Sequence, residues 1–75
     1  MKLPVISGQD AFKAFSKIGW YYERRARSNH IIMKKEGMKI ILSIPDHKVL
    51  DRGLLRSLIR DAYITVDDFV ELLNQ

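Results

Sequence analysis

The spacing of the hydrophobic residues changes along the chain, and each change marks a new element. Behind a capping pattern formed by Ser7 and Asp10, hydrophobic residues recur every three or four positions as far as Gly19. They are Ala11, Phe12, Phe15 and Ile18. This spacing predicts an amphipathic helix over residues 8–18, which the glycine ends.

From Trp20 onward, aromatic and β-branched residues replace the helical spacing. One strand is predicted to begin at Trp20, a second to cover residues 30–34, and a third to cover residues 38–44. Glu36-Gly37 is the predicted hairpin turn between the last two. Pro45 stops the third strand because proline has no backbone N–H to donate to a neighbouring strand.

Two further amphipathic helices are predicted after the strands. Asp51 begins one over residues 52–61, and Thr65 with Asp68 begins another over residues 66–73. The order α-β-β-β-α-α predicts an α+β fold, a three-stranded antiparallel sheet with the helices on one face, because each helix must bury its hydrophobic side. The other face of the sheet stays open. With no repeat or linker, residues 1–75 are expected to form a single domain.

A two-residue loop at Glu36-Gly37 would determine which side chains share a face. The pairs expected across the hairpin are His30 with Ser43, Ile32 with Ile41, and Lys34 with Lys39. Alternation then places five hydrophobic residues under the helices: Ile31, Met33, Ile40, Leu42 and Ile44. On the open face, Ile32 and Ile41 would form a small hydrophobic patch suited to a protein contact.

The composition narrows the class of protein. The chain carries a net charge of +4, and the charge is uneven, since residues 1–48 hold ten Lys and Arg against four Asp and Glu. A basic field of this kind favours polyanions such as nucleic acid, or an acidic protein. The absence of cysteine and the separation of the two histidines argue against disulfides, a thiolate nucleophile and a metal site, and no cofactor is expected. No membrane span or signal peptide is seen, so we expect a cytoplasmic protein that binds no membrane.

His30 is the residue best suited to chemistry. It follows a basic run and a turn-like Ser28-Asn29, and the alternation places it on the open face. Imidazole can give and take a proton near neutral pH, which suits a general acid or base. The candidate phosphate contacts are Arg24, Arg25, Arg27, Lys34 and Lys39. The same residues also fit a strand-end histidine with no chemical task and lysines that keep an open sheet soluble.

Several short motifs, in the order in which they occur, resemble the HicA (YcfA-like) family of toxins. They are Gly19-Trp20, His30-Ile31-Ile32-Met33-Lys34, Ile44-Pro45-Asp46-His47, Gly53-Leu54-Leu55-Arg56, Ala62-Tyr63-Ile64-Thr65 and Asp67-Asp68-Phe69. The resemblance covers almost the whole chain. It implies a fold similar to a double-stranded RNA-binding domain, an mRNA interferase activity and a HicB antitoxin as partner.

The resemblance also implies a role for His30. In the family, the catalytic histidine closes a Gly-Ser-His motif at the start of the second strand, and His30 takes that place after Ser28-Asn29. The two residues before His30 are Ser28-Asn29 and not Gly-Ser, so the glycine of the motif is missing, although asparagine tolerates positive φ better than most residues. Tyr63 replaces an expected glycine near the end of the second helix, a change expected to affect packing.

We predict one function for the chain and keep two alternatives. The chain is expected to cleave mRNA without a metal, using His30 as acid or base and the RNA 2′-hydroxyl as nucleophile, with His47 or solvent completing the proton transfers. A HicB-like antitoxin is expected to cover His30, Ile32 and Ile41. The alternatives are a non-catalytic RNA-binding module, which would not need His30, and a protein-interaction domain.

Overall fold

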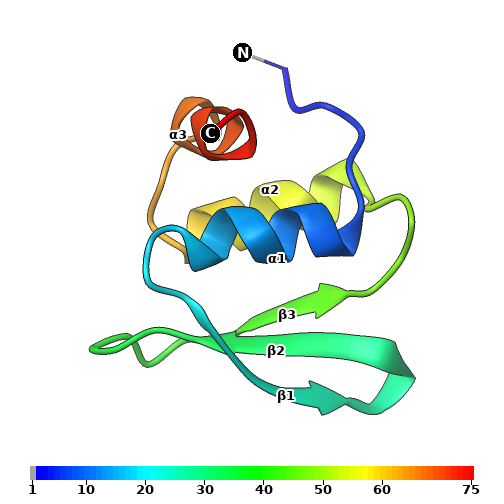
Figure 1. Ribbon diagram of the computed structural model, residues 1–75, viewed down its shortest axis with the longest axis vertical. Helices are drawn as coiled ribbons and strands as arrows, with labels where there is room; N and C mark the ends of the chain where they lie inside the picture. The colour runs from blue at the N-terminus through cyan, green and yellow to red at the C-terminus, as the bar shows by residue number, and fades with distance from the viewer. Residues whose placement is uncertain (1) are drawn as a thin grey trace.

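Three helices lie on one side of a three-stranded antiparallel sheet (Figure 1). The computed structural model describes residues 2–75. The strands are β1 (Tyr21–Ala26), β2 (His30–Lys34) and β3 (Leu42–Pro45), and β2 is central. The helices are α1 (Gly8–Ser16), α2 (Arg52–Asp61) and α3 (Val66–Leu73). The predicted α+β architecture and the order α-β-β-β-α-α are confirmed.

Each helix begins where its capping residue predicts. The Ser7 hydroxyl accepts a hydrogen bond from the Asp10 N–H at 3.1 Å, and the Asp10 carboxylate accepts one from the Ser7 N–H at 3.1 Å. These bonds satisfy N–H groups that the first turn leaves without a helical partner. Thr65 and Asp68 repeat the arrangement at α3, and Asp51 caps α2 by accepting from the Leu54 N–H at 2.9 Å.

The end of α1 falls two residues earlier than predicted, at Ser16 instead of residue 18. Gly19 has a φ of 99°, a conformation that glycine takes without strain, and it turns the chain toward β1. The neighbouring Lys17 reaches α3, where its Nζ donates hydrogen bonds to the carbonyls of Leu72 at 2.6 Å and Gln75 at 3.2 Å. A cation at the C-terminal end of a helix is stabilised by the unpaired carbonyls there.

The hydrophobic core fills the space between the helices and the inner face of the sheet. The largest fully buried side chains are Trp20, Phe15, Phe69, Ile31, Met33, Leu42, Ile44 and Leu55. Phe15 of α1 and Phe69 of α3 have ring centroids 5.1 Å apart. All three helices and the strands β2 and β3 contribute buried side chains to this core, whereas β1 contributes none.

The predicted register between β2 and β3 is wrong by two residues. The structure pairs His30 with Pro45, Ile32 with Ser43 and Met33 with Leu42. The turn at Glu36-Gly37 does form, closed by a hydrogen bond from the Met38 N–H to the Lys35 carbonyl, but residues 38–41 lie outside the ladder before β3 begins. A shift of two residues leaves each side chain on the same face of the sheet. Four of the five residues predicted to lie under the helices are therefore buried, and only Ile40 is exposed.

Two further expectations about burial are corrected. Ile32 lies on the face away from the helices as predicted, yet it is only 4% exposed, because it sits in the central strand with partners on both sides. It is therefore not half of an exposed pair with Ile41. Tyr63 has a φ of 60° and a side chain that is 82% exposed, so replacing the expected glycine places a ring in solvent and does not alter packing.

Candidate functional site

The face of the sheet that points away from the helices is called the outer face here. Strand pairing assigns side chains to it, since residues opposite each other in an antiparallel pair share a face. They are Tyr21, Arg24, Ala26, His30, Ile32, Lys34, Ser43 and Pro45. A bulge at Glu23 shifts the alternation in β1, so that Tyr22 faces the helices and packs edge-on against Phe12, with ring centroids 6.4 Å apart. His30 lies at one end of this outer face.

The chain reaches His30 through a tight turn. Arg27–Asn29 form a short 3₁₀ turn, and Ser28 and Asn29 have φ values of 61° and 60°. Two consecutive non-glycine residues in this left-handed region are uncommon and persist only where surrounding contacts hold them. The turn predicted at Ser28-Asn29 is therefore present, and its contacts matter for the position of His30.

A network of side chains holds this turn against the end of β3. The Arg25 Nη1 donates to the Asn29 Oδ1 at 2.6 Å and to the Asp46 Oδ2 at 3.0 Å. The other Asp46 oxygen accepts from the Gln9 Nε2 at 3.1 Å, and the Asp46 N–H donates to the Asn29 carbonyl at 3.0 Å. Residues from α1, β1, the turn and the end of β3 thus meet within one group of hydrogen bonds beside His30.

The start of α1 lies directly against the same segment. The Gly8 N–H donates to the His47 carbonyl at 2.9 Å. A Cβ on Gly8 would overlap the Pro45 carbonyl oxygen, so only glycine permits this approach. Since Pro45 pairs with His30 in the sheet, α1 supports the strand end that carries the histidine.

The hydrogen bond of His30 fixes which ring nitrogen is free. Its Nδ1 lies 3.3 Å from the Arg27 carbonyl oxygen, which can only accept, so Nδ1 carries the proton in this contact. In the neutral ring, Nε2 is then the unprotonated nitrogen. The side chain is half-buried, so the ring is held while remaining reachable from solvent.

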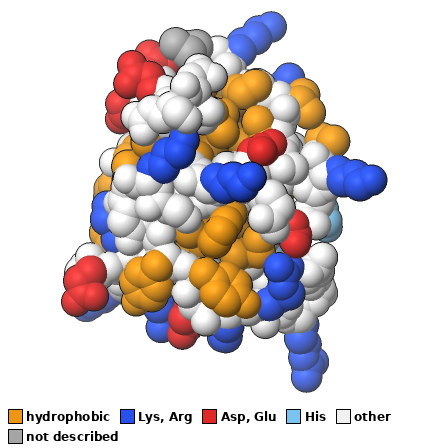
Figure 2. Space-filling view, in the orientation of Figure 1, with side chains coloured by type: hydrophobic (Ala, Val, Ile, Leu, Met, Phe, Trp, Pro, Cys, Tyr) orange, Lys and Arg blue, Asp and Glu red, His pale blue; other side chains and the backbone are white. Residues whose placement is uncertain are grey.

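The predicted phosphate contacts are all exposed, but they are not equivalent. Arg24 and Lys34 both lie on the outer face and share the carboxylate of Glu23, at 3.8 and 3.3 Å. Arg25 faces the helix side and is engaged by Asp46. Arg27 belongs to the turn, and Lys39 lies in the connection before β3, so the predicted pairing of Lys34 with Lys39 does not form. Figure 2 shows cationic side chains spread over the part of the molecule where the strands lie, with hydrophobic side chains between them.

The amino-acid sequence was compared with models of known protein families. Residues 8–64 match the model described as HicA toxin of bacterial toxin-antitoxin. The chain belongs to the HicA toxin family. A search of curated proteins and a search of solved structures each gave no match.

The HicA match runs from the first residue of α1 to the segment after α2, and so includes every residue of the hydrogen-bond network beside His30. It makes the chain a toxin of a toxin–antitoxin pair, as the resemblance implied, and gives it an antitoxin as partner. The match does not extend over α3, which contributes Phe69 and Leu72 to the core.

Other residues singled out in the sequence lie apart from the network. His47 is exposed and makes no side-chain hydrogen bond within that network. Ile41 is 40% exposed immediately before β3. Within residues 2–75, no helix could span a membrane, and no three side chains of metal-ligating type come together.

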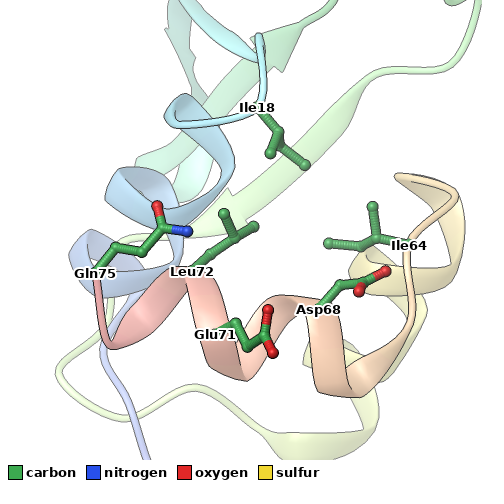
Figure 3. Close-up of a pocket in the computed structure, with 6 residues that line it drawn as sticks. All are labelled: Ile18, Ile64, Asp68, Glu71, Leu72 and Gln75. Carbon is green, nitrogen blue, oxygen red and sulfur yellow. The ribbon is translucent and has the colours of Figure 1, made fainter.

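A shallow hollow of about 260 Å³ lies away from His30, beside α3. Figure 3 shows Ile18, Ile64 and Leu72 at its hydrophobic side and Asp68, Glu71 and Gln75 at its rim. None of the candidate site residues lines it, and its acidic rim does not suit a nucleic acid.

Sequence reasoning did not identify Gln9 and Asp46 as part of the site. Asp46 stands next to Pro45 and His47 in a motif that was noted for its resemblance, but its partners are distant in sequence, with Gln9 37 positions away. The pKa of the Asp46 carboxyl is lowered from its usual 3.8, first by the hydrogen bond from Gln9 and then by that from Arg25. The turn at Arg27–Asn29 is called the histidine turn because it leads into His30. The charged Asp46 carboxylate stabilises the position of this turn through its hydrogen bond with Arg25.

Proposed function

We propose that this HicA-family toxin is an endoribonuclease that cleaves mRNA, with His30 as the proton-transfer residue and the RNA 2′-hydroxyl as the nucleophile. The observation that carries the proposal is the contact between the His30 Nδ1 and the Arg27 carbonyl. It holds the ring at the edge of the basic outer face and leaves Nε2 to exchange a proton with a substrate.

The proposed reaction needs few groups from the protein. His30 Nε2 takes the proton from a 2′-hydroxyl, the 2′-oxygen bonds to the adjacent phosphorus, and the bond from phosphorus to the 5′-oxygen breaks. The leaving 5′-oxygen takes a proton from solvent or from His47, and the products are a 2′,3′-cyclic phosphate and a 5′-hydroxyl. Arg24, Arg27 and Lys34 are suited to stabilise the charge that builds on the phosphate.

The antitoxin partner is proposed to be HicB-like and to cover the outer face around His30, with Ile41 as its hydrophobic contact. Ile41 is 40% exposed, whereas the buried Ile32 offers little surface to a partner. An mRNA substrate would place the toxin in the cytoplasm.

The test is the substitution His30→Ala. His47→Ala is measured beside it to identify the second proton source, because cleavage falls in that variant if His47 protonates the 5′-oxygen and is unchanged if solvent does. Cleavage of a defined RNA should fall by about 10²–10⁴-fold in His30→Ala, as is typical when a general acid or base is lost. RNA affinity and melting temperature should stay close to parental values, since the phosphate contacts remain. The parent should cut in excess chelator, and it should not cut an RNA whose 2′-hydroxyls are replaced by hydrogen.

Each alternative gives a different result. A stable His30→Ala variant that cuts at the parental rate would favour the non-catalytic RNA-binding module for this chain. Loss of RNA binding by the parent itself would favour a protein-interaction domain. Equal cutting of the 2′-deoxy substrate would exclude the 2′-hydroxyl as nucleophile.

A further inference from the structure

Tyr21 presents an exposed aromatic ring at the opposite end of the outer face from His30. It pairs with Lys34 in the sheet and its side chain is 49% exposed. Within residues 2–75 the ring makes no aromatic contact and the hydroxyl has no hydrogen-bond partner, in contrast to Tyr22, which packs on Phe12. A tyrosine ring that packs on no other ring leaves its face open to stack on a ligand.

The Tyr21 ring lies beside Lys34, at the end of β2 opposite to His30. Lys34 and His30 are the two ends of β2, four residues apart on the same face, which corresponds to about 13 Å along the strand. Cations flank the path between them, with Arg24 paired to the intervening Ile32 and Lys34 paired to Tyr21. A few nucleotides of an extended strand would cover this distance.

We infer that Tyr21 stacks on an unpaired base of the RNA, a few nucleotides from the phosphate held at His30, so that the substrate is single-stranded. The inference rests on the proposed function and adds the form of RNA that the site takes. Proteins that bind single strands combine a basic path with aromatic rings that stack on successive bases. In a duplex the bases are stacked on each other and cannot reach a ring on a flat sheet face.

Tyr63 serves as a control for this position, since Tyr22, which is 51% exposed, packs edge-on against Phe12. Tyr63 is 82% exposed, but it follows α2 and belongs to no strand. Substituting it removes the same ring from a surface that is not part of the outer face. Tyr21→Phe keeps the ring and removes only the hydroxyl.

The experiment measures RNA affinity in the non-cleaving His30→Ala background by fluorescence anisotropy. The probes are a short unstructured oligoribonucleotide and the same sequence annealed to its complement. Tyr21→Ala should weaken binding of the single strand by about five- to a hundred-fold, which is the range for one base–aromatic stack. Tyr21→Phe and Tyr63→Ala should bind like the background protein, and the duplex affinity should not respond to Tyr21→Ala. The dependence on salt should be unchanged in Tyr21→Ala, because no charge is removed.

The possible results separate this inference from the proposed function. Parental affinity in Tyr21→Ala, or an equal loss in Tyr21→Phe, overturns base stacking while cleavage by His30 can still stand. A selective loss in Tyr21→Ala supports stacking even if His30→Ala is found to cut RNA normally, in which case only the catalytic role fails. If Tyr21→Ala weakens the antitoxin complex but not RNA binding, the ring belongs to the protein interface. Absence of RNA binding in every variant overturns both.

Discussion

Asp46 is the residue on which the contacts of the histidine turn converge. Its carboxylate accepts from Gln9 and Arg25, and its N–H donates to the Asn29 carbonyl. Both side-chain donors stabilise the charged carboxylate, which is why its pKa lies below 3.8. The hydrogen bonds that position the turn therefore depend on pH in the acid range.

We predict that Asp46→Asn removes part of the acid sensitivity of the fold. A carboxyl whose pKa is lower in the folded chain than in the unfolded chain adds stability that is fully present above its unfolded pKa. That stability is lost as the pH falls through the lower, folded value. The parent should therefore lose more stability than Asp46→Asn between neutral pH and strong acid, measured by thermal unfolding followed by circular dichroism. At neutral pH the variant should be the less stable of the two.

Glu36→Gln provides the control for that measurement, because Glu36 is exposed at the hairpin turn. It should follow the parental pH profile. Asp10, whose pKa the backbone and hydroxyl of Ser7 lower, keeps its contribution in both variants. Identical profiles for the parent and Asp46→Asn would show that the carboxylate does not hold the turn.

At the scale of the elements, the helices could be predicted because their capping contacts are local in sequence. The register of β3 could not, because it depends on packing between residues distant in sequence. A capping box such as Ser7–Asp10 spans only four residues, so the sequence alone predicts where α1 starts. The register of β3 depends on how many residues pass between the turn and the first pair. Met38 packs against the core after the turn, and residues 38–41 lie outside the ladder, an arrangement that no short pattern reveals.

The same reasoning explains what could be predicted of the site. His30 and the turn before it could be identified from the basic run and from the family resemblance. Gln9 and Asp46 could not, since they meet only after α1 has packed against the end of β3. The bulge at Glu23, which determines that Tyr21 rather than Tyr22 lies on the outer face, also has no clear signal in the sequence.

The contact between α1 and the end of β3 gives a prediction at the element scale. Gly8→Ala should destabilise the fold by about 1–3 kcal/mol, the usual cost of overpacking, because the new methyl group meets the Pro45 carbonyl. For a domain of this size that corresponds to a drop of at least about 4 °C in melting temperature. Gly53→Ala is the matched control near the start of α2. Its Cβ would meet only the side-chain oxygen of Asp51, at 3.1 Å, so a smaller change is expected.

If Gly8→Ala melts at the parental temperature, α1 can move away from Pro45 without loss. Cleavage by that variant would then show whether the support of the strand end matters to His30. A larger loss in Gly53→Ala than in Gly8→Ala would contradict the prediction.

At the scale of the whole molecule, the sheet separates a helix side, which holds the core, from an outer face that is free for partners (Figure 1). RNA and antitoxin are both proposed to use that outer face. Because the two would compete for one surface, binding of the antitoxin would be enough to silence the toxin. This arrangement needs no conformational change in the toxin.

We predict that Ile41→Glu weakens the complex with the antitoxin by about ten-fold or more while the chain remains folded. A charged residue disrupts a desolvated hydrophobic contact, and substitutions at exposed positions usually alter stability by less than about 0.5 kcal/mol. Titration calorimetry of the toxin with its antitoxin measures the first effect and thermal unfolding the second. Val49→Glu, at a position that is 62% exposed in the connection before α2, should leave the complex intact.

Ile32→Glu should behave differently from both, because Ile32 is only 4% exposed and a carboxylate there would lose its hydration. We expect this variant to be strongly destabilised. A folded Ile41→Glu protein that binds the antitoxin at parental strength would place the interface elsewhere on the toxin.

The histidine turn also has a consequence for how the protein is made. Its Arg25–Asp46 hydrogen bond joins residues 21 positions apart, and the Gln9–Asp46 bond joins residues 37 positions apart. During synthesis, a growing chain in which Asp46 has not yet left the ribosome lacks the contacts that hold Asn29, although His30 has already emerged. Assembly of the turn before His30 therefore requires the chain as far as Asp46, and a segment that ends before Asp46 carries His30 without that support.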